Sequence, residues 1–183
     1  MVAVDTQPAP QSPPQALCAI AREAITAYLE RRAYRPPPLQ PPWQRSRGVF
    51  VTLRTLDDAL RGCIGHMEPM YESLSEEIAA CALSSALRDT RFAPVGREEL
   101  SGLRIEISLL TPTEPVADVG QLDARRYGVV VNAGGRRGVL LPDIEGVDSV
   151  EEQIRIASAK AGIPPGTPLQ LERFEVQKVA EPD

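Results

Sequence analysis

The order of predicted elements most restricts how this chain folds, because a hairpin, a helix and a strand occur twice in that order. The segments of the first copy are 48–54, 59–65, 71–87 and 103–109, and those of the second are 128–132, 138–141, 149–162 and 169–179. Alternating apolar residues indicate the strands, and a capping box from Ser149 to Glu152 opens the second helix. Within 169–179 the alternation slips between Leu171 and Phe174, which predicts a bulge or bend. The repeat predicts an α+β fold of mostly antiparallel sheets with helices packed on them.

Prolines divide the N-terminal part of the chain, because nine of the 18 fall in the first 42 residues. We expect 1–14 to be a disordered Pro-rich tail and 35–42 to be an extended, stiff connector. Between them 15–34 predicts a helix with one apolar stripe, formed by Leu17, Ile20, Ala21, Ala24 and Tyr28. The chain from 15 to 180 is expected to be one domain with two lobes, roughly 48–110 and 127–179.

Length, charge and composition exclude several classes of protein. A net charge of −5 and an aromatic content of 4% argue against nucleic acid as a partner. No apolar run approaches the roughly 20 residues that span a bilayer, and the N-terminus lacks the cationic start and apolar centre of a signal peptide. Three cysteines spaced 45 and 18 residues apart form no disulfide framework. We therefore expect a cytoplasmic protein with no membrane association.

The run Leu60-Arg61-Gly62-Cys63-Ile64-Gly65 places a thiol between two glycines in a strand-like segment. Glycine is costly in a strand, so either something approaches the backbone closely or the strand bends. An even-length turn at Asp57-Asp58 pairs Thr52 with Cys63, Arg54 with Arg61 and Val51 with Ile64. The two faces are then Val51, Leu53, Leu60 and Ile64 on the core side, and Phe50, Thr52, Arg54, Arg61 and Cys63 on the other.

This arrangement leads to a reactive-cysteine hypothesis for Cys63. A guanidinium two residues along the same strand face is about 7 Å away and favours the thiolate. Cys63 would act as a nucleophile or redox thiol, with Arg54 and Arg61 binding an anionic substrate. In the alternative, a helix covers this face and Cys63 is an inert packed side chain, as expected for Cys18 and Cys81 within helices.

His66 is a further candidate site residue, either as a metal ligand or as a base for Cys63. The C-x-x-H spacing of Cys63 and His66 lacks the other zinc ligands, because Cys18 and Cys81 would have to leave helix faces. Direct activation of Cys63 by His66 requires a turn at Gly65. We therefore expect no metal site, and no cofactor is expected because the nucleotide-binding motifs are absent.

The remaining arginines each allow two interpretations. Arg136 and Arg137 follow Gly134-Gly135, and they either help to bind an anion or are solvated at a tight hairpin turn. Arg91 either forms one wall of a cleft or pairs with the C-terminus of the preceding helix.

The hexamer LRGCIG, followed by Glu68-Pro69, resembles the signature of the AMMECR-one domain family, also called AmmeMemoRadiSam system protein A. The likeness extends from about Leu17 to Val179 and includes GVFVTL, Asp89–Phe92, Glu98–Leu100 and GVVVNAGGRRGVLLP. It implies two subdomains with a cleft, and a pathway or complex with a Memo-like protein and a radical S-adenosylmethionine enzyme. The family's activity is not established, so no catalytic residues transfer from it, and its usual candidate site is the hexamer.

Two functions are therefore expected for the hexamer. The first is an enzyme or enzyme subunit that acts through Cys63 and Arg61 on a small anionic substrate. The second is a non-catalytic adaptor, in which Gly62 and Gly65 let a partner segment approach the backbone. In that case Leu60, Ile64 and Glu68 belong to the docking surface.

Overall fold

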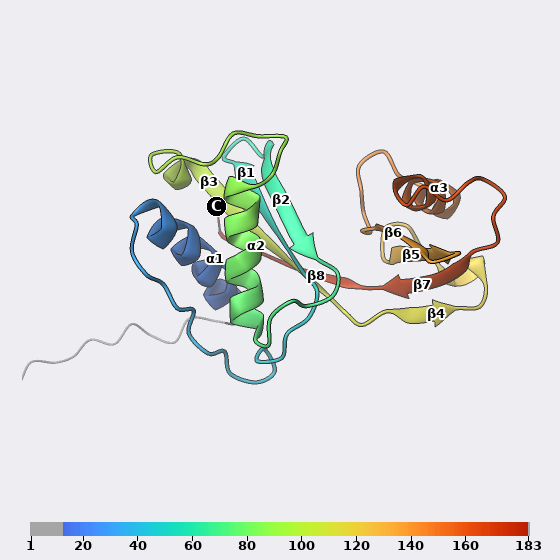
Figure 1. Ribbon diagram of the computed structural model, residues 1–183, viewed down its shortest axis with the longest axis horizontal. Helices are drawn as coiled ribbons and strands as arrows, with labels where there is room; N and C mark the ends of the chain where they lie inside the picture. The colour runs from blue at the N-terminus through green and yellow to red at the C-terminus, as the bar shows by residue number, and fades with distance from the viewer. Residues whose placement is uncertain (1–12, 183) are drawn as a thin grey trace, which may run out of the picture. The chain divides into compact units, whose positions relative to one another are not determined.

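The computed structural model describes residues 13–182, which form two compact units. Unit 1 takes the chain up to Ser108 and again from Lys178, and unit 2 is Leu109–Gln177. The described residues contain three α-helices and two four-stranded sheets, labelled in Figure 1. This is the α+β architecture predicted from the repeat. The predicted disordered tail lies outside the described residues, except that the first helix begins at Pro13.

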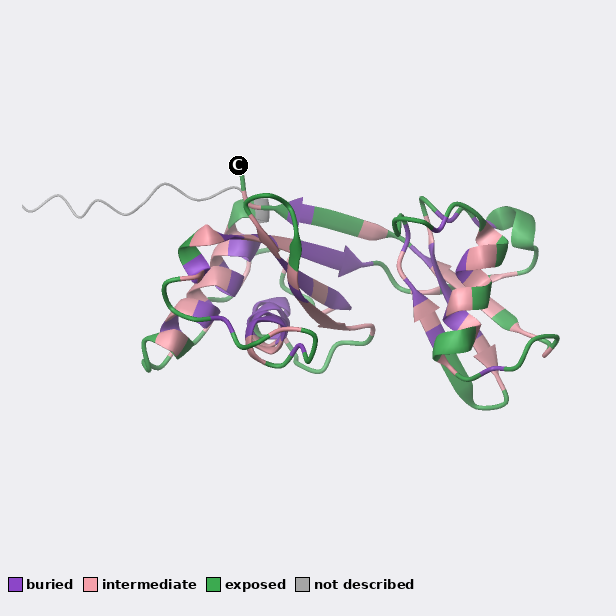
Figure 2. Ribbon diagram, turned by 90° about the horizontal axis from the view of Figure 1, so that it is seen from above, coloured by how far each residue is buried: buried purple, intermediate pink, exposed green. Residues whose placement is uncertain are grey.

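Unit 1 is a sheet with two helices on one of its faces (Figure 1 and Figure 2). The sheet has the strand order β2-β1-β3-β8. Its elements are α1 (Pro13–Leu29), β1 (Val49–Thr55), β2 (Leu60–His66), α2 (Leu74–Leu87), β3 (Leu103–Leu110), β8 (Val176–Ala180) and the short 3-10 helix Leu100–Gly102. α1 packs against α2, and α2 packs on β1 and β2. None of the helices in the described part of the chain is both long and apolar enough to cross a bilayer.

α1 is shorter than predicted. It ends in a Schellman-type cap, in which the Arg32 N–H donates to the Ala27 carbonyl and Arg31 takes a φ of 58°. The four aliphatic residues of the predicted stripe are buried, but Tyr28 is 56% exposed. The stripe prediction is wrong for Tyr28, because the chain leaves the helix within the turn that follows it.

α2 begins three residues later than predicted. The Ser73 side chain caps it by accepting a hydrogen bond from the Glu76 N–H, which ends the preceding loop at Ser73. Its predicted inward face is confirmed, because Leu74, Ile78, Cys81, Ala82 and Ser85 are all buried.

The β1–β2 hairpin has the predicted register near Cys63 and a different one near the turn. Thr52 lies opposite Cys63, but the register shifts after Leu53, so that Arg54 lies opposite Leu60 instead of Arg61. The predicted Arg54–Arg61 pair is therefore wrong. The prediction that Leu60 lies on the core face is also wrong, because Leu60 is 37% exposed beside this irregular turn.

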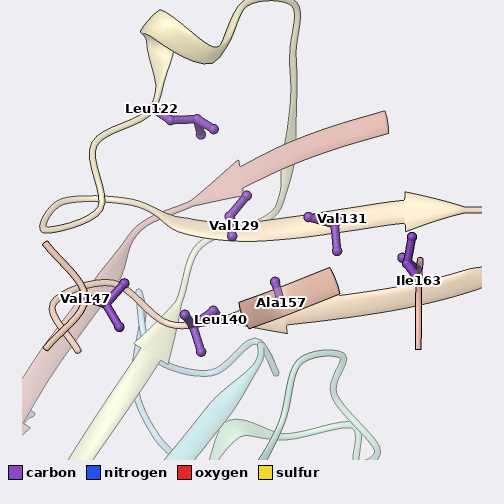
Figure 3. Packing of buried hydrophobic residues seen from close by; sticks show 7 residues of the cluster. All are labelled: Leu122, Val129, Val131, Leu140, Val147, Ala157 and Ile163. Carbon is purple, nitrogen blue, oxygen red and sulfur yellow. The ribbon is translucent and has the colours of Figure 1, made fainter. Parts of the chain in front are cut away.

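Unit 2 is a smaller sheet with one helix. The strand order is β4-β7-β5-β6. Its elements are β4 (Glu114–Val116), the 3-10 helix Val119–Gln121, β5 (Gly128–Ala133), β6 (Arg136–Leu140), α3 (Val150–Lys160) and β7 (Gln170–Phe174). Figure 3 shows its hydrophobic core, formed by Leu122, Val129, Val131, Leu140, Val147, Ala157 and Ile163.

The two units repeat one three-stranded motif. β1 is flanked by β2 and β3, and β5 is flanked by β6 and β7. Gly62 lies opposite Leu53 in unit 1, and Gly138 lies opposite Val131 in unit 2. A Cβ at Gly62 would clash with the Ser85 carbonyl of α2, and a Cβ at Gly138 would clash with the corresponding carbonyl of α3. The repeat therefore extends from strand order to helix packing.

The segment 169–179 differs from its prediction. β7 pairs with β5 in regular register from Gln170 to Phe174, so the predicted bulge between Leu171 and Phe174 is absent from this pairing. The irregularity comes at Glu175, after which the chain joins the other sheet as β8. The break in the alternation of apolar residues thus marks the point where the chain passes from one sheet to the other. A strand that changes sheets can also change which of its faces is buried.

Candidate functional site

Cys63 lies in the middle of β2, on the sheet face opposite α2. Its neighbour Gly62 faces that helix, and successive side chains in a strand point to opposite faces. The Cys63 thiol is partly buried, and the Thr52 hydroxyl donates a hydrogen bond to its sulfur at 3.3 Å. Thr52 is itself 7% exposed. The predicted cross-strand pair therefore gives the thiol a fixed hydroxyl neighbour.

Asp89 and Arg91 contact the backbone of Cys63 at the open edge of β2. Because β2 is the first strand of its sheet, one side of its backbone has no neighbouring strand. The Cys63 N–H donates to Asp89 Oδ2 at 2.9 Å, and the Cys63 carbonyl accepts from Arg91 Nη2 at 3.4 Å. We call these two residues the Asp89–Arg91 clamp. They occupy the hydrogen-bonding groups that another strand would otherwise use.

The clamp is held together by charge. Arg91 Nε donates to Asp89 Oδ1 at 2.9 Å, and Arg91 Nη2 donates to Asp89 Oδ2 at 2.7 Å. These bonds to Arg91 hold the pKa of the Asp89 carboxyl well below its usual range. The Asp89 side chain is 6% exposed and that of Arg91 is 55% exposed. The Arg91 guanidinium is thus exposed beside the Cys63 carbonyl, and its charge is paired with that of Asp89.

Arg61 has partners within the chain, which the sequence did not predict. Its Nε and Nη2 donate to the two oxygens of Glu99 at 2.5 and 3.0 Å, and Nη2 also donates to the Ala93 carbonyl. The Arg61 guanidinium lies 5.7 Å from the centre of the Phe92 ring. Arg61 therefore fixes the segment that carries the clamp, and its charge is balanced by Glu99.

The other charged residues predicted for the site, three arginines and Glu68, are distributed over both units. Arg54 donates to the Asp58 carbonyl at the hairpin turn, and Glu68 is exposed in the loop between β2 and α2. Arg136 and Arg137 belong to unit 2. Arg136 donates to the Gly162 carbonyl, and Arg137 lies 3.9 Å from a Glu172 oxygen.

The turn between β5 and β6 has the backbone that the hairpin interpretation requires. Gly134 and Gly135 have φ values of 54° and 78°, in the left-handed region. The anion-binding alternative for Arg136 and Arg137 stays a prediction.

The two glycines of the hexamer face other parts of this chain. Gly62 allows the backbone of α2 to pack directly on β2, and the ring of Phe50 occupies the space beside Gly65. The close approach predicted from these glycines is confirmed, but the approaching groups are intramolecular. Ile64, between Cys63 and Gly65, is partly buried and donates its N–H to Ser85 Oγ at 2.8 Å.

His66 belongs to a separate cluster on the α2 side of β2. β2 continues unbroken to His66, so the turn at Gly65 that would bring His66 to Cys63 is absent. His66 Nδ1 instead lies 2.5 Å from Glu77 Oε1 and 3.7 Å from Cys81 Sγ. The expectation that Cys81 would have to leave its helix face to meet His66 is wrong, because that face is directed at β2.

From the sequence, Asp89 was named only as part of the family resemblance and not as a site residue, and Glu77 was missed. Asp89 had a usable signal, since an aspartate two residues before an arginine after a helix can form a local ion pair. Glu77 had a weaker one. It lies among the inward-facing positions of α2, where a charged residue requires partners.

The fold and the site together define a class of protein. It is an α+β protein with a duplicated β-hairpin, helix and strand motif, and one copy carries a thiol at a charged strand edge. The AMMECR1 family model matches residues 18–179. This chain belongs to the AMMECR1 family.

Several proteins are similar to this chain. A Thermotoga maritima protein is 48% identical over 137 residues, which cover 74% of this chain and 79% of that protein. A Clostridium acetobutylicum protein is 39% identical over 166 residues, which are 88% of this chain but 35% of that protein. The crystal structure of an uncharacterized Pyrococcus horikoshii protein superposes with a TM-score of 0.77 at 35% identity, covering 88% of each chain.

Proposed function

We propose that this protein is an enzyme, or the thiol-bearing subunit of one, in which Cys63 attacks a small anionic substrate. One observation carries the proposal. The Cys63 thiol accepts a hydrogen bond from Thr52, and the exposed Arg91 guanidinium contacts the Cys63 carbonyl. A hydroxyl that donates to sulfur stabilises the negative charge carried by the attacking sulfur, and an exposed guanidinium can bind an anionic group of the substrate.

The proposed roles differ among the site residues. Cys63 is the nucleophile, Thr52 donates to its sulfur, and Arg91 attracts the anionic group of the substrate. Arg61 is a positioning residue, since through Glu99 and the Ala93 carbonyl it holds the segment that supplies Arg91. In the covalent step, the thiol proton passes to water and the sulfur electron pair forms an S–C bond. The leaving group departs with the electron pair of the bond that breaks.

We further propose that this reaction belongs to a pathway with a Memo-like protein and a radical S-adenosylmethionine enzyme. The resemblance of the hexamer implies these partners. In the Clostridium acetobutylicum relative the matched portion is about a third of the chain, so a sequence like this one occurs joined to further protein. That arrangement supports a function carried out beside another protein.

Alkylation of the native protein tests the thiolate. The full chain is treated with iodoacetate or iodoacetamide over a range of pH, and labelling at each cysteine is read by mass spectrometry. Cys18 and Cys81 are internal controls, because burial raises the pKa of each thiol to about 12. We expect only Cys63 to be labelled quickly, with a preference for the anionic reagent.

The variant Arg91→Gln tests whether Arg91 attracts anionic reagents to the Cys63 thiol. Iodoacetate and iodoacetamide react by the same displacement of iodide and differ in charge, so their rate ratio reports attraction by a nearby cation. We expect this ratio to fall in Arg91→Gln. Labelling of Cys63 as slow as that of Cys18, or an unchanged ratio in the variant, contradicts the proposal.

A non-catalytic adaptor is the second candidate, favoured by the longer Clostridium acetobutylicum relative. The glycines no longer support it, because other parts of the chain fill the space beside them. Leu60, the first residue of the hexamer, and Glu68, three residues after it, are exposed. An adaptor retains a purified Memo-like partner when Cys63 is changed to serine and loses it in Leu60→Arg. The enzyme proposal predicts instead that Cys63→Ser abolishes turnover.

A further inference from the structure

A second group of chemically active side chains lies on the opposite face of β2 from Cys63. His66 at the end of β2 meets Glu77 and Cys81, which are one turn apart on α2, and Figure 1 shows these two elements side by side. An imidazole nitrogen, a carboxylate oxygen and a sulfur from these residues all lie within 4.8 Å of one another. Three different donor atoms therefore converge at one point between a strand and a helix.

Two of the three distances between the donor atoms are close to those of a tetrahedral metal site. Zinc bond lengths require about 3.3 Å between nitrogen and oxygen ligands and about 3.6 Å between sulfur and either of them. Cys81 Sγ lies 3.7 Å from His66 Nδ1 and 3.9 Å from Glu77 Oε1, so both sulfur edges nearly fit. The 2.5 Å between His66 and Glu77 has to widen. The His66 side chain is 33% exposed, and this leaves the ring room to rotate.

Glu77 is already oriented as a ligand. Its side chain is fully buried, and Oε2 accepts hydrogen bonds from the backbone N–H groups of Met70 and Tyr71 at 2.7 and 2.9 Å. Those bonds leave Oε1 directed at His66 and Cys81. Hydrogen bonds to the second oxygen are the outer contacts that hold a metal-binding carboxylate in place.

We propose that His66 Nδ1, Glu77 Oε1 and Cys81 Sγ form a binding site for a divalent transition-metal ion such as Zn²⁺, with water in the fourth position. Nitrogen, sulfur and one carboxylate oxygen suit zinc and cobalt, whereas magnesium and calcium prefer oxygen ligands alone. Binding forms the metal–sulfur bond and releases the thiol proton of Cys81 to water. The ion would lie between His66 Nδ1 and Glu77 Oε1, which are in direct contact in this structure.

Burial and metal binding have opposite effects on Cys81. Burial raises the pKa of this thiol to about 12, so without a metal it stays protonated. A bound cation stabilises the thiolate directly. Each ion bound should therefore displace the thiol proton of Cys81.

Cobalt provides the first test, because Co²⁺ bound to a thiolate has a sulfur-to-metal charge-transfer band. The reduced, metal-free full chain is titrated with Co²⁺ and then with Zn²⁺. We expect one Co²⁺ per chain, a thiolate band, and displacement by one equivalent of Zn²⁺. No saturable binding, or a Co²⁺ spectrum without the thiolate band, overturns the proposal.

Matched cysteine variants locate the site. Cys81→Ser should remove the band, whereas Cys63→Ser, on the opposite face of the same strand, should retain it. Retention in Cys81→Ser, or loss in Cys63→Ser, places the metal elsewhere and overturns the assignment. This outcome is independent of the Cys63 alkylation result.

His66→Gln keeps the test usable if Cys81→Ser fails to fold, because His66 is partly exposed. We expect Zn²⁺ affinity to fall by more than about 100-fold in His66→Gln, since even an outer partner of a metal ligand is worth about 10- to 100-fold. Circular dichroism of the metal-free variant confirms that it is folded. Unchanged affinity in a folded His66→Gln protein contradicts the proposal.

Discussion

In unit 1 and unit 2 a helix packs on the sheet in the same way, at a glycine, but the residues next to that glycine differ. In both, a glycine in the edge strand of the hairpin lets a helix carbonyl approach the sheet. The next cross-strand pair is Thr52 with Cys63 in unit 1 and Val130 with Val139 in unit 2. The motif therefore folds with two apolar residues at this position. Thr52 and Cys63 are not needed to build it.

The helix side shows the same contrast. Cys81 lies four residues before Ser85 in α2, and Gln153 lies four residues before Ala157 in α3. The Gln153 amide donates to the carbonyls of Tyr127 and Leu141 and so joins elements of its own unit.

The position of His66 in unit 1 corresponds to Pro142 in unit 2, two residues past the Ile64 and Leu140 positions. Unit 2 thus shows which residues the shared motif needs in order to fold. The reactive side chains of unit 1 that have no counterpart in unit 2 are the ones to which we assign function.

The largest predicted effect tests the shared packing rule. Gly62→Ala and Gly138→Ala should each destabilise the protein by about 3 kcal/mol or more, because the added methyl group meets a helix backbone that cannot rotate away. Urea unfolding of the full chain measures this, with Gly96→Ala as the control, since a Cβ at Gly96 meets nothing within 4 Å. If only one of the two substitutions destabilises the protein, the helices of the two units do not pack on their sheets in the same way.

A second prediction concerns the clamp of unit 1. Asp89→Asn should cost about 2 kcal/mol at neutral pH, the value of hydrogen bonds to a charged partner. Because the folded-state pKa of Asp89 is lowered, its contribution is complete above the unfolded pKa near 3.9 and is lost as the pH falls toward the folded value. Fluorescence of the single tryptophan, Trp43 in unit 1, reports unfolding.

The difference between wild type and Asp89→Asn should shrink progressively below about pH 4. Ser101→Ala, at an exposed position of the same unit, is a control that should change neither stability nor its pH dependence. A constant difference from pH 7 to pH 3 contradicts the assigned role of the carboxylate.

A third prediction sharpens the contrast between the two cross-strand pairs. Thr52→Val gives unit 1 the residue found in unit 2 and removes the hydroxyl that donates to Cys63. Alkylation of Cys63 at pH 7 should slow about fivefold, equivalent to about 1 kcal/mol for one hydrogen bond. Thr52→Ser keeps the hydroxyl and should retain most of the rate. Equal rates in Thr52→Val and wild type rule out a role for this hydroxyl.

The smallest effect is expected for the thiol itself. Cys63→Val reproduces the residue at the matching position of unit 2 and should change the free energy of unfolding by less than about 0.5 kcal/mol. Thermal unfolding measures this change. A loss of several kcal/mol would make Cys63 a packing residue and would remove the reason to assign it a chemical role.

Local patterns predicted most of the elements and part of the site. Alternation located most of the strands, the serine before α3 marked the start of that helix, and the pairing of Thr52 with Cys63 followed from the positions of two strands about one turn. The shift after Leu53 could not be predicted in this way. It depends on the backbone of the turn, where Asp58 has a φ of 69°.

The charged partners were harder to predict because they come from distant segments. Arg61 and Glu99 are 38 residues apart and meet only when the segment after α2 folds back along the edge of β2. Glu99 pairs with Arg61 as Asp89 pairs with Arg91, and of the two guanidinium groups that of Arg91 is the more exposed.

The sequence by itself determined the α+β class, the repeat and the face of β2 on which Cys63 lies, since these depend on residue spacing along single elements. Only the tertiary structure decided which sheet each end of 170–180 joins, which groups fill the space at Gly62 and Gly65, and that His66 meets Cys81. The physical reason is that periodicity specifies which way a side chain points, whereas its partner depends on how separate elements pack.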